Sequence, residues 1–204
     1  MPSTDNRPGS SPASRVFLGL YLYPDTALQF VSLRQTRTEA IQGTWMNPHD
    51  LHLTILFGGE QEEKTFALWK DSARILQEAL SPLVSDHRRQ TAEIHWRRDR
   101  RLLAITFDRT VPFWMKAEET SRTLSGTLLP MEQFRPFWPH LTLARNARLD
   151  PQTLESLSES LHALFRQHPP LWKGVRLYKS VPSPSRTEDR YQTLADHPFP
   201  EEGR

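Results

Sequence analysis

The chain has 204 residues, 37% of them hydrophobic, and its 26 lysines and arginines nearly balance 24 aspartates and glutamates. This length suits one medium domain or two small lobes, and a formal charge of +2 does not indicate a general nucleic-acid binder. The sequence contains no cysteine, which excludes disulfides, thiolate metal sites and cysteine nucleophiles.

The two ends of the chain are polar. Residues 1–14 are rich in proline and serine and lack an apolar signal region, so we expect a disordered tail and a cytoplasmic protein. No apolar run approaches the roughly 20 residues of a membrane helix, so we expect no membrane contact. We expect residues 15–197 to form one bilobal domain and residues 198–204 to form a C-terminal tail. We also expect the protein to be a monomer.

The first half of the chain alternates strand and helix patterns. The expected elements are a strand at 15–23, a helix at about 26–41, a strand at 51–57 and a helix at about 62–80. Pro24 ends the first strand, and Asp25 can cap the helix that follows it. Gly58 and Gly59 are expected to close the second strand.

The second half begins with two strand-like runs joined by an arginine-rich tip. The expected elements are strands at 92–96 and 102–107, a helix at 112–128, a strand from 140, a helix after Pro151, and strands at 175–181 and 191–194. The tip holds Arg97, Arg98, Arg100 and Arg101. A solvated hairpin tip is the favoured interpretation, and a local basic patch is the alternative.

One motif occurs twice, as His-Leu-Thr-Ile from His52 and His-Leu-Thr-Leu from His140, each in an apolar run. Side chains at i and i+2 of a strand share a face. Each strand therefore places an imidazole beside the hydroxyl of Thr54 or Thr142, with leucine on the other face. Of the eight histidines only these two have threonine two positions later, which favours a functional pair over two structural histidines.

The positions of the copies, one on each side of the middle, predict an α+β fold of two similar lobes facing across a cleft. Two imidazoles in one cleft suit general acid–base catalysis, because one can be neutral while the other is protonated. The threonine hydroxyls suit the oxygens of a phosphate. Two histidines are fewer than the three protein ligands of a catalytic zinc, so we expect no metal and no cofactor. Attack by water on a phosphodiester is the reaction that these residues favour.

In these paired motifs the chain resembles the 2H phosphoesterase superfamily. Within that superfamily it resembles the bacterial RNA 2′,3′-cyclic phosphodiesterases, once called 2′–5′ RNA ligases. The residues that carry the resemblance are Arg15-Val16-Phe17, Leu51 to Ile55 with Gly59-Glu60, Pro139 to Arg145, Tyr178-Lys179-Ser180 and Tyr191.

The resemblance implies a bilobal fold of two pseudo-symmetric lobes, with antiparallel sheets around a central groove and helices outside. It implies metal-free hydrolysis of a 2′,3′-cyclic phosphate, on an RNA end or a small cyclic nucleotide, to a 2′-phosphate. By motif position His52 would be the proton donor and His140 the proton acceptor. Thr54, Thr142 and Arg145 would bind the substrate phosphate.

Several positions depart from the family pattern. Gly58 replaces the usual leucine, Leu56 stands where relatives often carry arginine, and residues 183–190 lack a common glycine. Aromatic side chains near the motifs could stack on a base, although ordinary packing is favoured for each: Trp45, Phe137 and Trp138. A 2′–5′ RNA ligase acting by the reverse reaction and a non-catalytic RNA- or nucleotide-binding module stay open as alternatives.

Overall fold

The computed structural model describes residues 13–35, 42–89, 91–129, 136–167, 171–181 and 190–201. Its strands are β1 (Ser14–Leu22), β2 (Gln42–Trp45), β3 (His52–Gln61), β4 (Ala92–Arg97), β5 (Leu102–Phe107), β6 (His140–Arg148), β7 (Trp172–Ser180) and β8 (Tyr191–Pro198). Its α-helices are α1 (Pro24–Gln35), α2 (Phe66–Leu80), α3 (Pro112–Leu128) and α4 (Pro151–Gln167). Short 3-10 turns are η1 (Pro48–Asp50), η2 (Glu63–Thr65), η3 (Ser81–Arg89) and η4 (Arg98–Arg100).

The strands form one antiparallel sheet that divides into two halves. The order is β4-β5-β6-β3-β1-β7-β8, with β2 added on β6. Among the described residues, β3 and β6 share a single residue pair, Leu53 with Leu141. The other strands that are neighbours in this order pair over five or more residues. Each half contributes one motif strand at the junction, which confirms the expected α+β architecture of two similar lobes.

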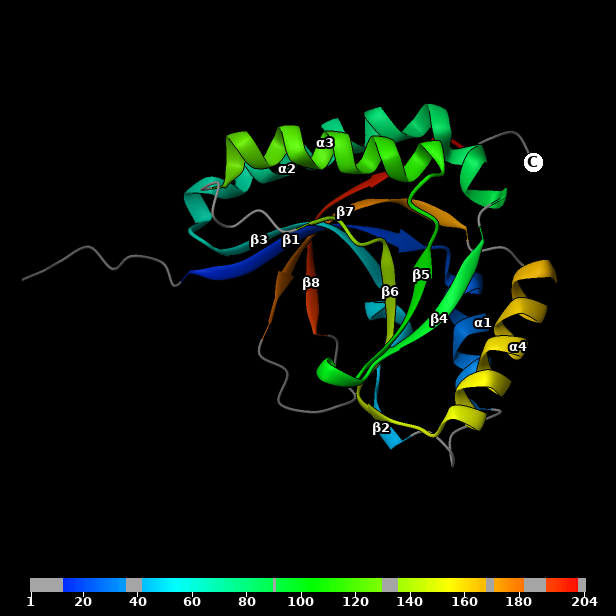
Figure 1. Cartoon of the computed structure of the whole chain (residues 1–204). Helices are drawn as coiled ribbons and strands as arrows, with labels where there is room; N and C mark the ends of the chain where they lie inside the picture. Colours follow the sequence, from blue (N-terminus) through cyan, green and yellow to red (C-terminus); the bar gives the residue numbers. More distant parts are fainter. Residues whose placement is uncertain are drawn as a thin grey trace, which may run out of the picture.

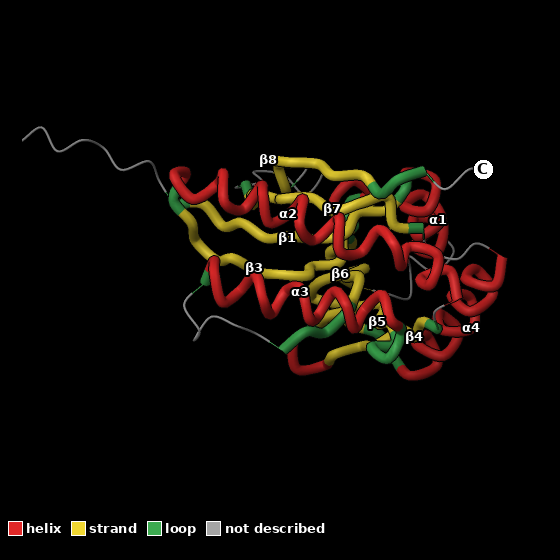
Figure 2. Tube along the Cα trace, turned by 90° about the horizontal axis from the view of Figure 1, so that it is seen from above, coloured by secondary structure: helices red, strands yellow, loops and turns green. Residues whose placement is uncertain are grey.

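The helices cover the outer side of the sheet. Helices α2 and α3 lie together over the β3-β1-β7-β8 half, and α1 and α4 lie together beside the other half (Figure 1, Figure 2). Strand alternation explains the arrangement, because Val16, Leu18 and Leu20 of β1 are fully buried on the helix side, against a core that includes Trp69 and Leu76 of α2. The opposite face of the sheet, which we call the groove face, is left for the motif side chains.

The glycines after the first motif do not end the strand, contrary to expectation. Strand β3 continues to Gln61, with an extra residue opposite β1 and a positive φ of 65° at Gly59. A Cβ at Gly58 would lie 2.6 Å from the ring of Trp69. Trp69 therefore fills the space that the usual leucine would need, which accounts for this departure from the family pattern.

At the C-terminus the folded part extends further than the sequence indicated. Strand β8 extends to Pro198, and Phe199 is buried and donates its backbone N–H to the carbonyl of Lys173 at 2.9 Å. The C-terminal tail therefore does not begin at 198. Strand β2 was not expected, and Ser14, assigned to the N-terminal tail, belongs to β1. Residues 1–12 of that tail, residues 36–41 of the expected helix and most of the loop 183–190 lie outside the described residues. None of the described helices has the length and apolarity needed to cross a bilayer.

Candidate active site

The two motif strands bring four polar side chains together at the centre of the sheet. β3 and β6 run antiparallel and pair through the leucines of the two motifs, both fully buried. Continuing this register by one residue on each side sets His52 opposite Thr142 and Thr54 opposite His140. All four lie on the groove face, because the intervening leucines point into the core. Opposed side chains in such a pair have Cβ atoms roughly 5 Å apart.

Each motif is followed by a β-bulge that changes which residues face the groove. Ile55 and Leu143 are the extra residues, because the partner strands pair with the positions on either side of them. A bulge shifts the alternation of a strand, so Arg145 shares the face of the second motif. The equivalent position after the first motif is Phe57, which is 37% exposed. The two halves thus differ: one adds a cation beside the motifs and the other adds an apolar ring.

The ring of His52 is anchored at one nitrogen and enclosed by aromatic side chains. Its Nδ1 lies 2.6 Å from the carbonyl oxygen of Asp50. A carbonyl only accepts, so Nδ1 carries the hydrogen and Nε2 is the nitrogen left to exchange a proton. The rings of Phe17, Tyr191 and Tyr178 surround the imidazole, with centroids 4.7, 4.9 and 5.2 Å away.

His140 repeats this anchoring in the other half. Its Nδ1 donates to the carbonyl of Trp138 at 2.7 Å, again two residues before the histidine, which leaves Nε2 for proton transfer. The Trp138 ring stacks on the imidazole at a centroid distance of 4.0 Å and an angle of 20°. The same hydrogen bond in both halves fixes two imidazoles in one tautomer and orientation.

The surroundings of both histidines favour the neutral ring in the free protein. Burial lowers the pKa of His52 to about 4, and the positive charge of Arg145 acts in the same direction, against the bond to the Asp50 carbonyl. Burial also lowers the pKa of His140, helped by the charges of Arg145, Arg100 and Arg97. An anion bound between these groups would reverse part of the effect, because it favours the protonated rings.

A groove of about 1130 Å³, which we call the His140 groove, opens beside the second motif. Its walls include Thr54, His140, Thr142 and the guanidinium groups of Arg145, Arg97 and Arg100. Among the described residues no hydrogen bond occupies the hydroxyl of Thr54 or of Thr142, and neither hydroxyl is sealed from solvent. The groove therefore offers free hydroxyl donors and the guanidinium of Arg145 to an anion, with Arg97 and Arg100 beside it partly balanced by Asp99.

The structure places two residues of the arginine-rich tip in this groove. Leu102, just after the tip, pairs with Arg145 across β5 and β6, so the tip folds over the second motif. The Arg97 guanidinium lies 5.5 Å from the centre of the Trp138 ring. Arg97 and Arg100 thus line the groove, as the alternative of a local basic patch implies, while their side chains stay 40% and 66% exposed, as in a solvated tip. The sequence shows the cluster of charges, but only the strand pairing shows where it lies.

The three aromatic residues considered for base stacking lie in different surroundings. Phe137 is buried in the core, and the half-buried Trp45 packs against that core, so ordinary packing explains both. Trp138 lines the His140 groove and stacks on the catalytic candidate itself. Sequence reasoning missed Tyr178 and Tyr191 as groove-face residues, although both belong to the family pattern.

Metal ligands do not gather around the motifs. Within the described ranges no group of three or more histidine, aspartate or glutamate side chains is placed to hold a metal ion. A catalytic zinc uses three protein ligands and an open position. The residues assembled in the groove are suited to acid–base chemistry and to anion binding.

Comparison with family models gave no match, and neither did comparison with curated proteins. Solved structures do match over nearly the whole chain. E. coli LigT in its apo form is 22% identical with a TM-score of 0.57, covering 93% of this chain and 99% of LigT. A structure described as a phosphoesterase is 22% identical with a TM-score of 0.58 and the same coverage.

A third neighbour is the protein TT0787 of Thermus thermophilus. It is 20% identical with a TM-score of 0.56, covering 91% of this chain and 97% of TT0787. In each of these three comparisons the match covers more than nine-tenths of both chains. The chain therefore has the fold of LigT and of the 2H phosphoesterases, as its paired His-x-Thr motifs indicate.

Proposed function

We propose that the protein is a phosphodiesterase that hydrolyses 2′,3′-cyclic phosphates of RNA ends or nucleotides to 2′-phosphates. The observation that carries the proposal is the facing pair of His-x-Thr motifs, with each Nδ1 bonded to a backbone carbonyl so that each Nε2 is left for proton transfer. Arg145 makes this part of the groove attractive to a phosphate, and the pair Arg97 and Arg100 outweighs the single carboxylate of Asp99 between them. Among the fold neighbours, LigT has been crystallised with phosphate and with 3′-AMP, which supports a phosphate site here.

The reaction needs two proton transfers and no covalent intermediate. A neutral imidazole accepts a proton from water as its oxygen bonds to phosphorus, and a protonated imidazole donates a proton to the 3′ oxygen as the P–O3′ bond breaks. The family resemblance assigns donation to His52 and acceptance to His140. The hydroxyls of Thr54 and Thr142 and the guanidinium of Arg145 would hold the non-bridging oxygens, where charge shifts in the transition state.

The decisive experiment is incubation of the protein with a 2′,3′-cyclic nucleotide, and with a short RNA bearing the same end, followed by chromatography and phosphorus NMR. A 2′-phosphate product supports the proposal. Joining of two RNAs through a 2′–5′ bond would instead favour the ligase, and saturable binding without any product would favour the binding module.

Catalysis should not need a metal ion. The rate in excess EDTA should stay within about twofold of the untreated rate, because the groove supplies its own proton carriers and cations. The measurement is initial rate with and without chelator, repeated after adding Mg²⁺, Mn²⁺ or Zn²⁺. Loss of activity in EDTA with recovery on adding one of these ions would indicate metal-assisted hydrolysis instead.

The pH dependence should be bell-shaped, and substrate should move it toward higher pH. With a pKa of about 4, His52 is neutral in the free protein at neutral pH, so a donor at this position gains its proton together with the anionic substrate. The profile of kcat, which reports the complex, should therefore lie at higher pH than the profile of kcat/KM, which reports the free protein.

The same profiles test the assignment of roles. Loss of the donor should flatten the alkaline limb in whatever activity remains, and loss of the acceptor should flatten the acidic limb. We expect the first result for His52→Ala and the second for His140→Ala. The opposite pattern would exchange the two roles, and a wild-type rate that rises steadily with pH would remove the need for a protonated histidine.

A further inference from the structure

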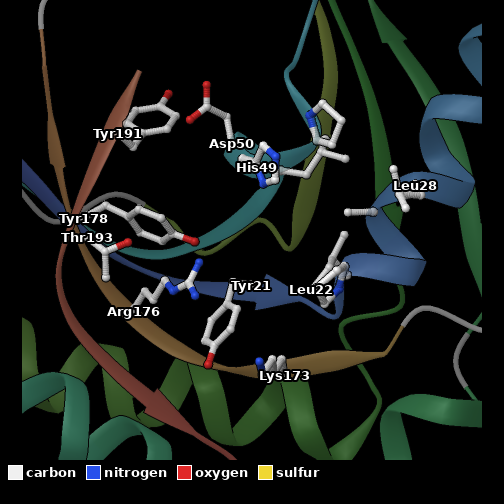
Figure 3. A pocket seen from close by; sticks show the side chains of 14 residues that line it. Tyr21, Leu22, Leu28, His49, Asp50, Lys173, Arg176, Tyr178, Tyr191 and Thr193 are labelled. Atoms are coloured by element: carbon white, nitrogen blue, oxygen red, sulfur yellow. The ribbon is translucent and has the colours of Figure 1, made fainter. Parts of the chain in front are cut away.

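A second cavity, which we call the Tyr21 cavity, lies on the groove face of the β3-β1-β7-β8 half (Figure 3). It encloses about 380 Å³, and its walls include Tyr21, Leu28, Leu51, Arg176, Tyr178 and Tyr191. Small-molecule sites have volumes of about 300–1,000 Å³, so this cavity is large enough for one nucleobase. None of the residues proposed for catalysis lines it, and its role is therefore separate from the chemical step.

The Tyr21 cavity begins directly beside the first catalytic candidate. Tyr178 and Tyr191 line the cavity and also pack against the ring of His52, with centroid distances of 5.2 and 4.9 Å. The His140 groove lies on the other side of the motif pair, because its walls include Thr54, His140 and Thr142. A substrate whose reacting phosphate lies between the histidines can thus extend in two directions.

One wall of the cavity is formed by the paired side chains of Arg176 and Tyr21. The Arg176 guanidinium lies 3.7 Å from the centre of the Tyr21 ring, and its Nη2 donates to Asp196 at 3.0 Å. Figure 3 shows the Arg176 side chain between Tyr21 on one side and Tyr178 on the other, and all three residues line the cavity. A guanidinium fixed between two aromatic side chains forms with them a surface against which a base can pack.

The charges around the cavity favour a base over a second phosphate. Asp196 balances Arg176, and the buried Asp50 carboxylate accepts the backbone N–H of Arg190, so the main net positive charge left on the wall is Lys173. The rest of the lining is largely apolar. Leu28 at the rim is 60% exposed and adds an apolar side chain that a bound base could contact.

We propose that the Tyr21 cavity binds the base of the nucleotide on the 5′ side of the reacting cyclic phosphate. The proposal rests on the function proposed above and adds its substrate class: RNA ends of two or more nucleotides are preferred over cyclic mononucleotides. The neighbouring base packs between the wall formed by Arg176 and Tyr21 and the apolar rim, while the linking phosphate passes over Tyr178 and Tyr191.

The test compares three substrates that carry the same 2′,3′-cyclic end: a mononucleotide, a dinucleotide, and a dinucleotide whose 5′ residue lacks its base. Stacking of one base on a protein surface is worth about 1–3 kcal/mol, so kcat/KM should be about 5- to 150-fold higher for the intact dinucleotide than for the other two. Variants Arg176→Gln and Leu28→Ala should each reduce this preference about threefold or more and leave the mononucleotide rate within twofold.

Matched controls lie on the outer helix α2. Arg74→Gln removes an exposed arginine that is paired with Glu78, and Leu68→Ala shortens a leucine that is 46% exposed. Neither should change the preference, and thermal unfolding of all four variants reports whether the fold is kept. Equal kcat/KM for the three substrates, or an equal loss for mono- and dinucleotide in both cavity variants, would overturn the subsite. Absence of turnover of all three substrates in the wild type would overturn the proposed function instead.

Discussion

Replacing either His52 or His140 by alanine should lower kcat by about 10²- to 10⁴-fold, because each proton transfer by a positioned side chain typically contributes that much. Both imidazole rings are held in the same tautomer and orientation for this role. Each Nδ1 donates to the carbonyl two residues earlier in the chain, at 2.6 Å for His52 and 2.7 Å for His140. Each ring is also held by aromatic packing, so little rearrangement is needed before the proton moves.

The histidine variants need a control for folding, because both rings are packed against aromatic side chains. His52→Asn and His140→Asn keep an N–H near the position of Nδ1 and lose Nε2, so they should be nearly as inactive as the alanine variants while preserving the backbone contact. His95→Ala removes a histidine from the exposed side of β4 and should have no effect on turnover.

The double variant adds a further test of shared function. If the two histidines act in one step, losing both should cost much less than the product of the two single losses. A single alanine variant with more than about a tenth of the wild-type rate would contradict the two-histidine mechanism, since it would remove less than the smallest effect expected of a catalytic proton carrier.

The centre of the fold was predictable because its signals are local and repeated. Alternation of apolar residues in strands and the two His-Leu-Thr motifs place leucine in the core and the polar pair on the opposite face, as observed. Arg145 also lies where the resemblance implied. The sequence alone does not show that Arg145 faces the groove. By simple alternation it would face the core, and only the pairing of β6 with β5 reveals the bulge at Leu143 that turns it to the groove face.

The residues that sequence reasoning missed are placed by contacts between distant segments. Strand β2 has the sequence Gln-Gly-Thr-Trp, which carries no strand pattern, and it forms because β6 offers a free edge to Thr44 and Trp45. Arg97 and Arg100 enter the groove through the register of β5 on β6. Tyr21 and Arg176 meet only because β1 and β7 are neighbours.

Replacing Thr54 or Thr142 by valine should lower kcat by about 10²-fold or more for each residue, the typical cost of losing one preorganised donor to a developing oxyanion. Valine has nearly the shape of threonine and suits a strand, so the sheet should be retained. The hydroxyls have no partner among the described residues and line the His140 groove, so the free protein loses no internal hydrogen bond when they are removed.

The kinetic pattern distinguishes this role from simple substrate binding. A donor that acts mainly in the transition state lowers kcat and kcat/KM together, whereas a donor that binds substrate and transition state equally raises KM and leaves kcat unchanged. We expect the first pattern for both threonines. Thr123→Val on α3, whose hydroxyl donates to the carbonyl of Glu119, is the matched control and should leave both constants unchanged.

The two threonine variants should also differ from each other, because the motifs are related by pseudo-symmetry but Arg145 lies beside only one of them. Arg145 can still hold the oxygen that Thr142 releases, while Phe57 offers no such replacement beside Thr54. The loss of kcat should therefore be larger for Thr54→Val than for Thr142→Val. Unchanged kinetics in both variants would reduce the threonines to strand packing and leave the phosphate to the arginines.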